Sequence, residues 1–105
     1  MLSIETRSSD KQQVITIIGA LEGVDAIGFR EQIAKLIEQQ IDSVVLDLRQ
    51  LNSIDLIGYN TLVMLRKITQ QRTVNLYLDA PKHNVVHEYI HLSKFEFNYI
   101  QQGAR

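Results

Sequence analysis

Residues 43–58 read SVVLDLRQLNSIDLIG, and this stretch decides the fold. Its first half, SVVLDL, is an almost continuous apolar run with a β-branched start, which is typical of a strand buried on both faces of a sheet. Its second half leads through a short loop to Asp55, and helical periodicity begins directly after that residue. Because Asp is a favoured N-cap, Asp55 marks the start of a helix. A buried strand followed so closely by a helix predicts an α/β fold.

The segments on either side of this stretch alternate between strand and helix patterns. We expect strands, in chain order, at LSIET, VITII, SVVLDL, TVNLYL and KFEFNYI. We expect helices over residues 25–40, after Asp55, and over KHNVVHEYIHL, which Pro81 opens. The order is therefore β-β-α-β-α-β-α-β. It predicts a single domain over residues 1–105, with a mixed four- to five-stranded sheet and three main helices packed on it.

The two longer helices each carry an apolar stripe that we expect to face the sheet. These stripes consist of Ala26, Phe29, Ile33, Leu36 and Ile37 in the first helix, and of Leu62, Leu65 and Ile68 in the second. The opposite side of the second helix carries Tyr59, Val63, Arg66 and Lys67. Between the second strand and the first helix, Gly19 and Gly23 are expected to form the turn.

The composition is that of an ordinary soluble globular protein. Of the 105 residues, 45% are apolar and 22% are charged, and the formal net charge is −1. This balance gives no electrostatic reason to expect binding to nucleic acid or to an anionic membrane. The absence of cysteine excludes disulfides and thiolate chemistry. With no signal-peptide pattern at the start and no apolar run long enough for direct membrane insertion, we expect a cytoplasmic protein.

The motif HEYIH, residues 87–91, matches the zinc-protease pattern His-Glu-x-x-His. In that interpretation His87 and His91 bind one zinc ion and Glu88 is the base. A catalytic zinc ion needs a third protein ligand, however, and Glu96, the nearest acid downstream, lies in a predicted strand. The polar residues of this helix share one arc opposite an apolar arc, and they are His83, Asn84, His87, Glu88 and His91. We therefore favour a solvent-facing helix side and predict no metal site.

Asp47 is a carboxylate inside an apolar strand, where an unpaired charge would be costly. Two interpretations are open: a functional acid, or a structural group that accepts hydrogen bonds from backbone amides of the following loop. We favour the structural role, because no second acid or His has a reason in the sequence to face it. The chain also has no Gly-x-Ser-x-Gly elbow, dinucleotide fingerprint or phosphate loop. We therefore predict neither catalysis nor a cofactor.

The first turn of the second helix is unusually apolar, because Leu56 and Ile57 follow Asp55 directly. One of the two can fold back onto the core as a hydrophobic staple, but neighbours in sequence point in different directions. Tyr59 and Val63, one turn apart, would extend the apolar surface into a docking patch. The predicted protein-binding site consists of Asp55, Leu56, Ile57, Gly58, Tyr59, Val63 and Arg66.

The whole chain resembles the STAS domain of bacterial anti-sigma-factor antagonists. The segment IIGALEG is similar to the family's strand that ends in Gly and an acidic turn, here Gly19 and Glu22. The segment VVLDLRQLNSID is similar to its central strand and loop, with Asp47 and Asp55 at matching positions. DLIG stands where the family usually shows Asp-Ser-Ser-Gly or Asp-Thr-x-Gly. The resemblance implies a regulatory module that binds another protein.

In that family the residue before the glycine is commonly a Ser or Thr that a partner kinase phosphorylates. A helix N-terminus suits phosphate, and the added charge opposes burial in an apolar contact. In this chain the position is Ile57, preceded by Leu56, and neither side chain can accept phosphate. The usual switch is therefore absent, and Ser53 and Thr61 are the nearest hydroxyl groups.

Three hypotheses of function follow. The first, which we favour, is a non-catalytic module that resembles an anti-sigma-factor antagonist and binds an anti-sigma factor or serine-kinase-like protein. The second is a free-standing STAS subunit of a membrane transporter, such as a lipid-trafficking ABC complex. The third is an enzyme built around HEYIH. The sequence leaves open whether the chain forms a homodimer through its opening hairpin.

Overall fold

The elements of the fold follow one another as predicted, with one additional strand. The structure is a computed structural model, and it describes residues 1–90 and 97–100. The elements are β1 (Leu2–Ser9), β2 (Gln12–Leu21), α1 (Gly23–Ile37), β3 (Ser43–Asp47), β4 (Leu51–Ile54), α2 (Leu56–Gln71), β5 (Asn75–Asp79), α3 (His87–Ile90) and β6 (Asn98–Tyr99). The predicted class, a mixed α/β fold with three helices, is confirmed.

All six described strands belong to one sheet, with the order β1-β2-β3-β5-β6 and β4 beside β2. Only the pairing of β1 with β2 is antiparallel, and the other described pairings are parallel. The ten-residue strand β2 has two neighbours on one side: β3 lies beside its first half and β4 beside its end. The register shifts between Gly19 and Ala20, where β4 takes over. The strand SVVLDL thus lies in the sheet interior, as its apolar run predicts.

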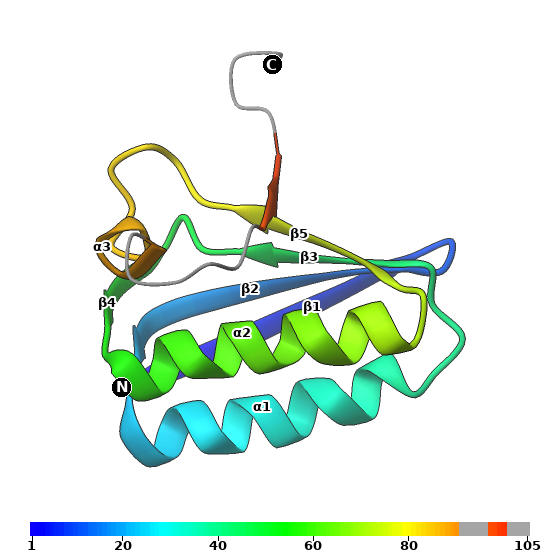
Figure 1. Ribbon diagram of the computed structural model, residues 1–105, viewed down its shortest axis with the longest axis horizontal. Helices are drawn as coiled ribbons and strands as arrows, with labels where there is room; N and C mark the ends of the chain where they lie inside the picture. The colour runs from blue at the N-terminus through cyan, green and yellow to red at the C-terminus, as the bar shows by residue number, and fades with distance from the viewer. Residues whose placement is uncertain (91–96, 101–105) are drawn as a thin grey trace.

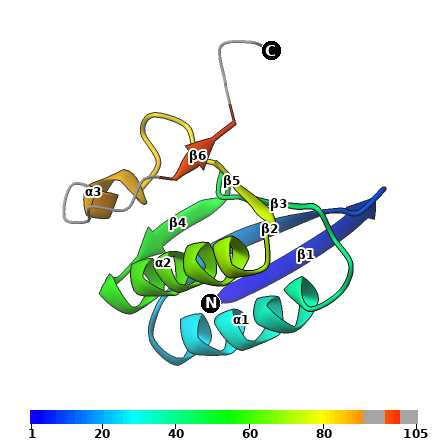
Figure 2. The same ribbon diagram turned by 45° about the vertical axis from the view of Figure 1, so that its right-hand side comes forward.

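Helices α1 and α2 lie side by side on one face of the sheet (Figure 1), and Figure 2 shows the strands behind them. The predicted stripes face the core, with Ala26, Phe29, Ile33, Ile37, Leu62 and Leu65 buried, and Leu36 and Ile68 half-buried. The strands contribute Ile15, Ile17, Val44, Leu46, Leu76 and Leu78 from the other side. None of the helices in the described part of the chain is long and apolar enough to cross a bilayer.

Three predicted elements differ from the structure. The strand predicted over KFEFNYI spans only Asn98–Tyr99 within the described residues, and residues 94–96 lie outside them. Residues 51–54, assigned to a loop, form β4, because the end of β2 extends past β3 and offers a free edge. The third helix, predicted over KHNVVHEYIHL, spans only His87–Ile90 within the described residues, and His91 lies outside them. Asn84 explains the late start: its side-chain oxygen accepts from the Val86 amide (3.0 Å), and its amide group donates to the Leu48 carbonyl (2.6 Å). Such local bonds compete with helix formation.

The turns agree with the residues found in them. Gly19 and Gly23 both have positive φ, +98° and +53°, which glycine adopts without steric cost. Gly23 lies where β2 gives way to α1, as predicted, whereas the turn role predicted for Gly19 is wrong: it lies within β2, at the register shift where β4 begins to pair. The two-residue turn between β1 and β2 also has positive φ at both positions, 46° at Asp10 and 65° at Lys11. This is the type I′ turn that joins closely paired antiparallel strands.

Candidate functional site

The candidate site lies where two neighbouring parallel strands end and two helices begin. β2 and β4 pair to their ends, with Leu21 opposite Ile54, and each is followed within two residues by a helix. The N-termini of α1 and α2 therefore meet at the carboxyl edge of the sheet (Figure 1). In open α/β folds this edge is where binding sites are commonly found.

A single carboxylate links the two helix starts. Asp55 is the N-cap of α2, and its Oδ1 accepts a hydrogen bond from the Gly58 amide at 2.7 Å, as the sequence predicts. Its Oδ2 accepts from the amide of Gly23, the first residue of α1, at 3.1 Å. Each helix start has amide groups without intrahelical partners, and Asp55 satisfies one of them at each. The carboxylate thereby fixes the relative position of the two N-termini.

Gly58 allows α2 to approach β2 closely. A Cβ at this position would overlap the Leu21 carbonyl oxygen, and it would also press on the Ile54 side chain at 2.9 Å. The glycine in DLIG is therefore required by packing. It brings the first turn of α2 directly against the end of the strand that precedes α1.

Thr61 adds a second connection between the helices. Its hydroxyl donates to the Ile57 carbonyl at 2.9 Å and lies 3.5 Å from the Ala26 carbonyl of α1. The residue is buried, next to Leu62 of the inner stripe. Ser53, the other nearby hydroxyl-bearing residue, is half-buried in β4.

Large apolar side chains are exposed near the starts of both helices and, in the case of Met64, further along α2. We define the tip patch as Leu56 (57% exposed), Ile57 (45%) and Met64 (41%) of α2 together with Val24 (83%) and Ile27 (41%) of α1. Arg30 of α1 donates to the Met64 sulfur at 3.1 Å, which brings the two helices together beside the patch. Both Leu56 and Ile57 are exposed, so neither acts as a buried staple. The contribution of α1 to this patch was not predicted from the sequence. The available signal was Val24, an apolar residue in the first turn of α1, directly after Gly23.

Three residues of the predicted site lie elsewhere than expected. Tyr59 is 3% exposed; it stacks on Tyr89 with ring centroids 5.7 Å apart and meets the edge of Phe97 at 6.4 Å. Val63 is half-buried against the core, and Arg66 is half-buried with its Nε fully covered. The expectation that Tyr59 belongs to an exposed patch is therefore wrong, because Tyr89 of α3 and Phe97 cover it, and Val63 and Arg66 are exposed only in part. Tyr59 is thus a core residue of this part of α2 and not a part of its exposed surface.

Asp47 has the structural role that we favoured, with an additional partner. Its Oδ1 accepts from the Arg49 amide at 3.1 Å, and the Arg49 guanidinium donates to both carboxylate oxygens at 2.9 and 2.8 Å. Arg49 also lies 3.5 Å from Asp79, the residue opposite Asp47 in β5. The guanidinium hydrogen bond is the largest cause that lowers the pKa of Asp47, and burial opposes it. Arg49 thus forms two ion pairs, with the carboxylates at the ends of β3 and β5.

The histidine segment does not assemble a metal centre in the described part of the chain. Residues 1–90 and 97–100 contain no group of three or more potential metal-ligating side chains. His83 is exposed, whereas His87 is half-buried, with Nε2 3.2 Å from the Ala80 carbonyl oxygen and its ring against Tyr99. The prediction that His87 faces solvent is therefore only partly met. A hollow of about 500 Å³ lies beside it, lined by Lys82, His83, Asn84, His87 and Glu88.

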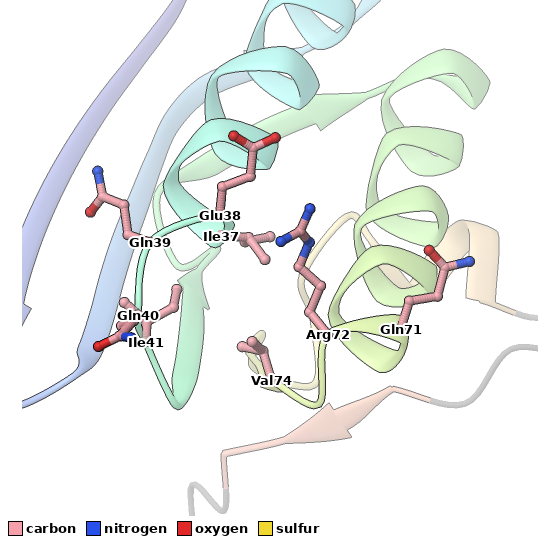
Figure 3. A pocket seen from close by; sticks show the side chains of 8 residues that line it. All are labelled: Ile37, Glu38, Gln39, Gln40, Ile41, Gln71, Arg72 and Val74. Atoms are coloured by element: carbon pink, nitrogen blue, oxygen red, sulfur yellow. The ribbon is translucent and has the colours of Figure 1, made fainter.

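A second hollow, of about 530 Å³, lies at the opposite ends of the two long helices (Figure 3). It is lined by Ile37, Glu38, Gln39, Gln40, Ile41, Gln71, Arg72 and Val74. Gln39 and Gln71 point away from it to opposite sides in Figure 3. Most of its polar side chains are exposed, and polar atoms do not converge on its centre as they do in a small-molecule site. The tip patch is the stronger candidate site.

A mixed sheet with α1 and α2 on one face defines a small mixed α/β domain. Residues 3–101 match the STAS domain, and the chain belongs to this family. A comparison with curated proteins finds no match.

Three solved structures show the same fold. The unphosphorylated anti-sigma factor antagonist SpoIIAA has a TM-score of 0.74 and 15% identity, over 96% of this chain and 88% of that chain. A putative anti-sigma factor antagonist from Thermotoga maritima has a TM-score of 0.79 and 15% identity, over 96% and 89%. An anti-sigma factor antagonist from Mycobacterium paratuberculosis has a TM-score of 0.73 and 16% identity, over 99% and 90%. At these identities the similarity establishes the fold.

Proposed function

We propose that this chain is a non-catalytic regulatory module that binds a protein partner through the tip patch. The observation that carries the proposal is the exposure of four large apolar side chains near two helix starts that Asp55 holds together, with Met64 exposed further along α2. We propose that these side chains form one apolar surface, because contiguous exposed apolar surface is the usual mark of a protein-binding site. Because anti-sigma factor antagonists share the fold, the partner class we propose is an anti-sigma factor or serine-kinase-like protein.

We propose further that the partner binds without the phosphorylation switch that the STAS resemblance implies. Ile57, the second residue of α2, stands at the position that the STAS resemblance assigns to the phosphoacceptor. Its side chain cannot accept phosphate, and its 45% exposure makes it available for an apolar contact. We propose that a partner binds regardless of phosphorylation at this turn, and that regulation acts on the partner.

The first experiment identifies the partner and measures its affinity for a charged variant. After affinity purification and mass spectrometry, binding of the purified partner is measured by calorimetry for wild type and Ile57→Asp. A charge within an apolar contact should weaken binding at least about tenfold, equal to about 1.4 kcal/mol. The fold should persist, because an acidic side chain in the first helical turn interacts favourably with the helix dipole. Circular dichroism checks this.

Two controls make the result specific. Gln71→Asp places the same charge on an exposed residue at the other end of α2 and should leave binding unchanged. Ile57→Ser should bind nearly as well as wild type, and it tests whether a kinase partner then phosphorylates the turn. Unchanged binding by Ile57→Asp would place the interface elsewhere. Recovery of an ABC ATPase with its membrane subunits would favour the transporter hypothesis over the sigma-factor pathway.

A further inference from the structure

Strand β1 has an open outer edge. It is eight residues long, it pairs with β2 without a register break, and no other described strand pairs with it. From Glu5 to Ser9 every side chain is exposed. Figure 2 shows the strand at the border of the sheet, with α1 on one face. A long edge without proline or bulge can pair with another strand.

The turn that follows β1 determines which of its backbone groups face outward. In the turn from Ser9 to Gln12, both central residues have positive φ, which defines a type I′ hairpin. The carbonyl of the first turn residue accepts from the amide of the fourth, so Ser9 and Gln12 form the first hydrogen-bonded pair. Antiparallel strands then alternate hydrogen-bonded and non-hydrogen-bonded pairs.

Because of this alternation, odd- and even-numbered residues of β1 direct their backbone groups to opposite sides of the strand. Odd-numbered residues direct their backbone groups towards β2, and the bond from the Ala20 amide to the Met1 carbonyl (3.2 Å) agrees with it. The backbone groups of the even-numbered residues point outward, away from β2. These residues are Leu2, Ile4, Thr6 and Ser8.

We propose that two copies of the chain form a dimer by antiparallel pairing of β1 with β1, around a two-fold axis at Thr6. Thr6 then faces Thr6 of the second copy, and Ile4 faces Ser8 of the second copy. All of these residues direct their backbone groups outward, so their amides and carbonyls pair across the axis. The two sheets become one continuous sheet.

Charge complementarity selects this register among the alternatives. With the axis at Thr6, Glu5 of each copy lies opposite Arg7 of the other, in the non-hydrogen-bonded pairs where side chains approach most closely. An axis at Glu5 would place the two Glu5 carboxylates opposite each other. An axis at Arg7 would place the two Arg7 guanidinium groups opposite each other, and like charges in such pairs are destabilising. An axis at Ile4 would leave most of the second half of β1 unpaired.

The helix layer leaves space beside this edge. A hollow of about 480 Å³ lies between β1 and α1, lined by Leu2, Ile4, Val24, Asp25, Gly28, Phe29 and Gln32. The side chains of Glu5 and Arg7 alternate with this helix-facing set and project from the other face of the sheet. A second β1 strand can therefore lie along the edge without displacing α1.

Charge reversal tests the pairing. Sedimentation equilibrium of the wild-type protein should show a concentration-dependent monomer–dimer equilibrium. Glu5→Arg and Arg7→Glu, each alone, place like charges opposite each other twice in the dimer and should weaken it about tenfold. The double variant Glu5→Arg/Arg7→Glu should restore wild-type affinity, which a merely damaged fold would not do. A wild type that stays monomeric at millimolar concentration, or single variants with unchanged affinity, would overturn the proposal.

Cysteine cross-linking tests the register, since the chain contains no cysteine of its own. Opposite residues in a hydrogen-bonded pair have Cα atoms about 5.5 Å apart, within the range that a disulfide can bridge. Thr6→Cys should therefore form a disulfide-linked dimer on mild oxidation. Ile4→Cys should remain monomeric under denaturing conditions, because its counterpart is Ser8, although an equal mixture with Ser8→Cys should cross-link. Cross-linking through Glu5→Cys but not through Thr6→Cys would overturn the register.

Discussion

At the scale of single residues, Asp55 determines the geometry of the candidate site, because one carboxylate accepts hydrogen bonds from the starts of two helices. Replacing Asp55 with Ala removes both acceptors and leaves two amides without their partner. The free energy of unfolding should fall by about 2 kcal/mol, the upper end of N-cap effects. Urea denaturation measures this loss, and hydrogen exchange at the Gly23 amide should become faster.

The Asn variant separates the two bonds of Asp55. An Asn side chain has one acceptor oxygen and an amide group that only donates, so it can satisfy one helix start at a time. We expect Asp55→Asn to lose about half as much stability as Asp55→Ala. Equal stability of wild type and Asp55→Ala would mean that the carboxylate does not hold the two helices together.

The sequence predicts the cap at Asp55 but not its second partner. An N-cap is a local pattern, since Gly58 lies three residues away, whereas Gly23 is 32 residues away and comes near only through the pairing of β2 with β4. Tyr59 shows the same limit. It lies opposite the core stripe of α2, but Tyr89 and Phe97, distant in sequence, bury it. Helical periodicity does not reveal a second covered face.

At the scale of elements, the contact of α2 with β2 depends on Gly58, and a matched pair of glycine variants tests it. In Gly58→Ala the new methyl group would overlap the Leu21 carbonyl, so the helix start must shift. Overpacking of this kind costs about 1–3 kcal/mol, and thermal unfolding should show a correspondingly lower midpoint.

The control is Gly28, which lies within α1, is exposed, and has no atom within 4 Å of an added Cβ. Gly28→Ala should stabilise the protein by about 0.5–1 kcal/mol, because Ala loses less backbone entropy in a helix. Opposite signs for the two substitutions are therefore expected. A stabilising Gly58→Ala would contradict the close approach of α2 to β2.

Element types were predictable wherever a pattern was long. The 15-residue α1 and 16-residue α2 follow from helical periodicity, and β3 from its apolar run. The four-residue β4 was missed, because a strand this short carries little alternation and exists through pairing with β2. The third helix starts later than predicted, since the Asn84 side chain holds the preceding turn in another conformation.

At the scale of the whole molecule, the apolar tip patch and a cluster of charged side chains both lie at the edge of the sheet where the parallel strands end. The tip patch follows β2 and β4, and the Asp47–Arg49–Asp79 ion pair follows β3 and β5. The proposed dimer edge lies on β1, a different border of the same sheet. A partner on the tip patch and a second copy on β1 would thus use neighbouring surfaces, because Val24 belongs to the tip patch and also lines the hollow beside β1.

The ion pair links the stability of the whole molecule to pH. Asp47 is buried in the folded protein, and the Arg49 guanidinium holds the pKa of its carboxyl below the ordinary value of 3.8. A group whose pKa is lower in the folded state contributes stability that is present above the unfolded pKa. This contribution is lost as the pH falls through the folded pKa. The free energy of unfolding should therefore decrease as the pH is lowered below about 4.

Replacing Arg49 with Gln tests this linkage. The Arg49 side chain is half exposed, so solvent screens the pair and we expect a loss of only about 1–2 kcal/mol at pH 7. Because burial then acts on Asp47 without the guanidinium, its folded pKa should rise and the acid-dependent loss of stability should shrink. The difference in free energy of unfolding between wild type and Arg49→Gln should consequently narrow as the pH falls below 4.

Urea denaturation at a series of pH values measures the free energy of unfolding of both proteins. Arg72→Gln is the control, because it removes the same charge from an exposed position after α2. A constant difference between pH 7 and pH 3 would show that Arg49 does not act through the ionisation of Asp47.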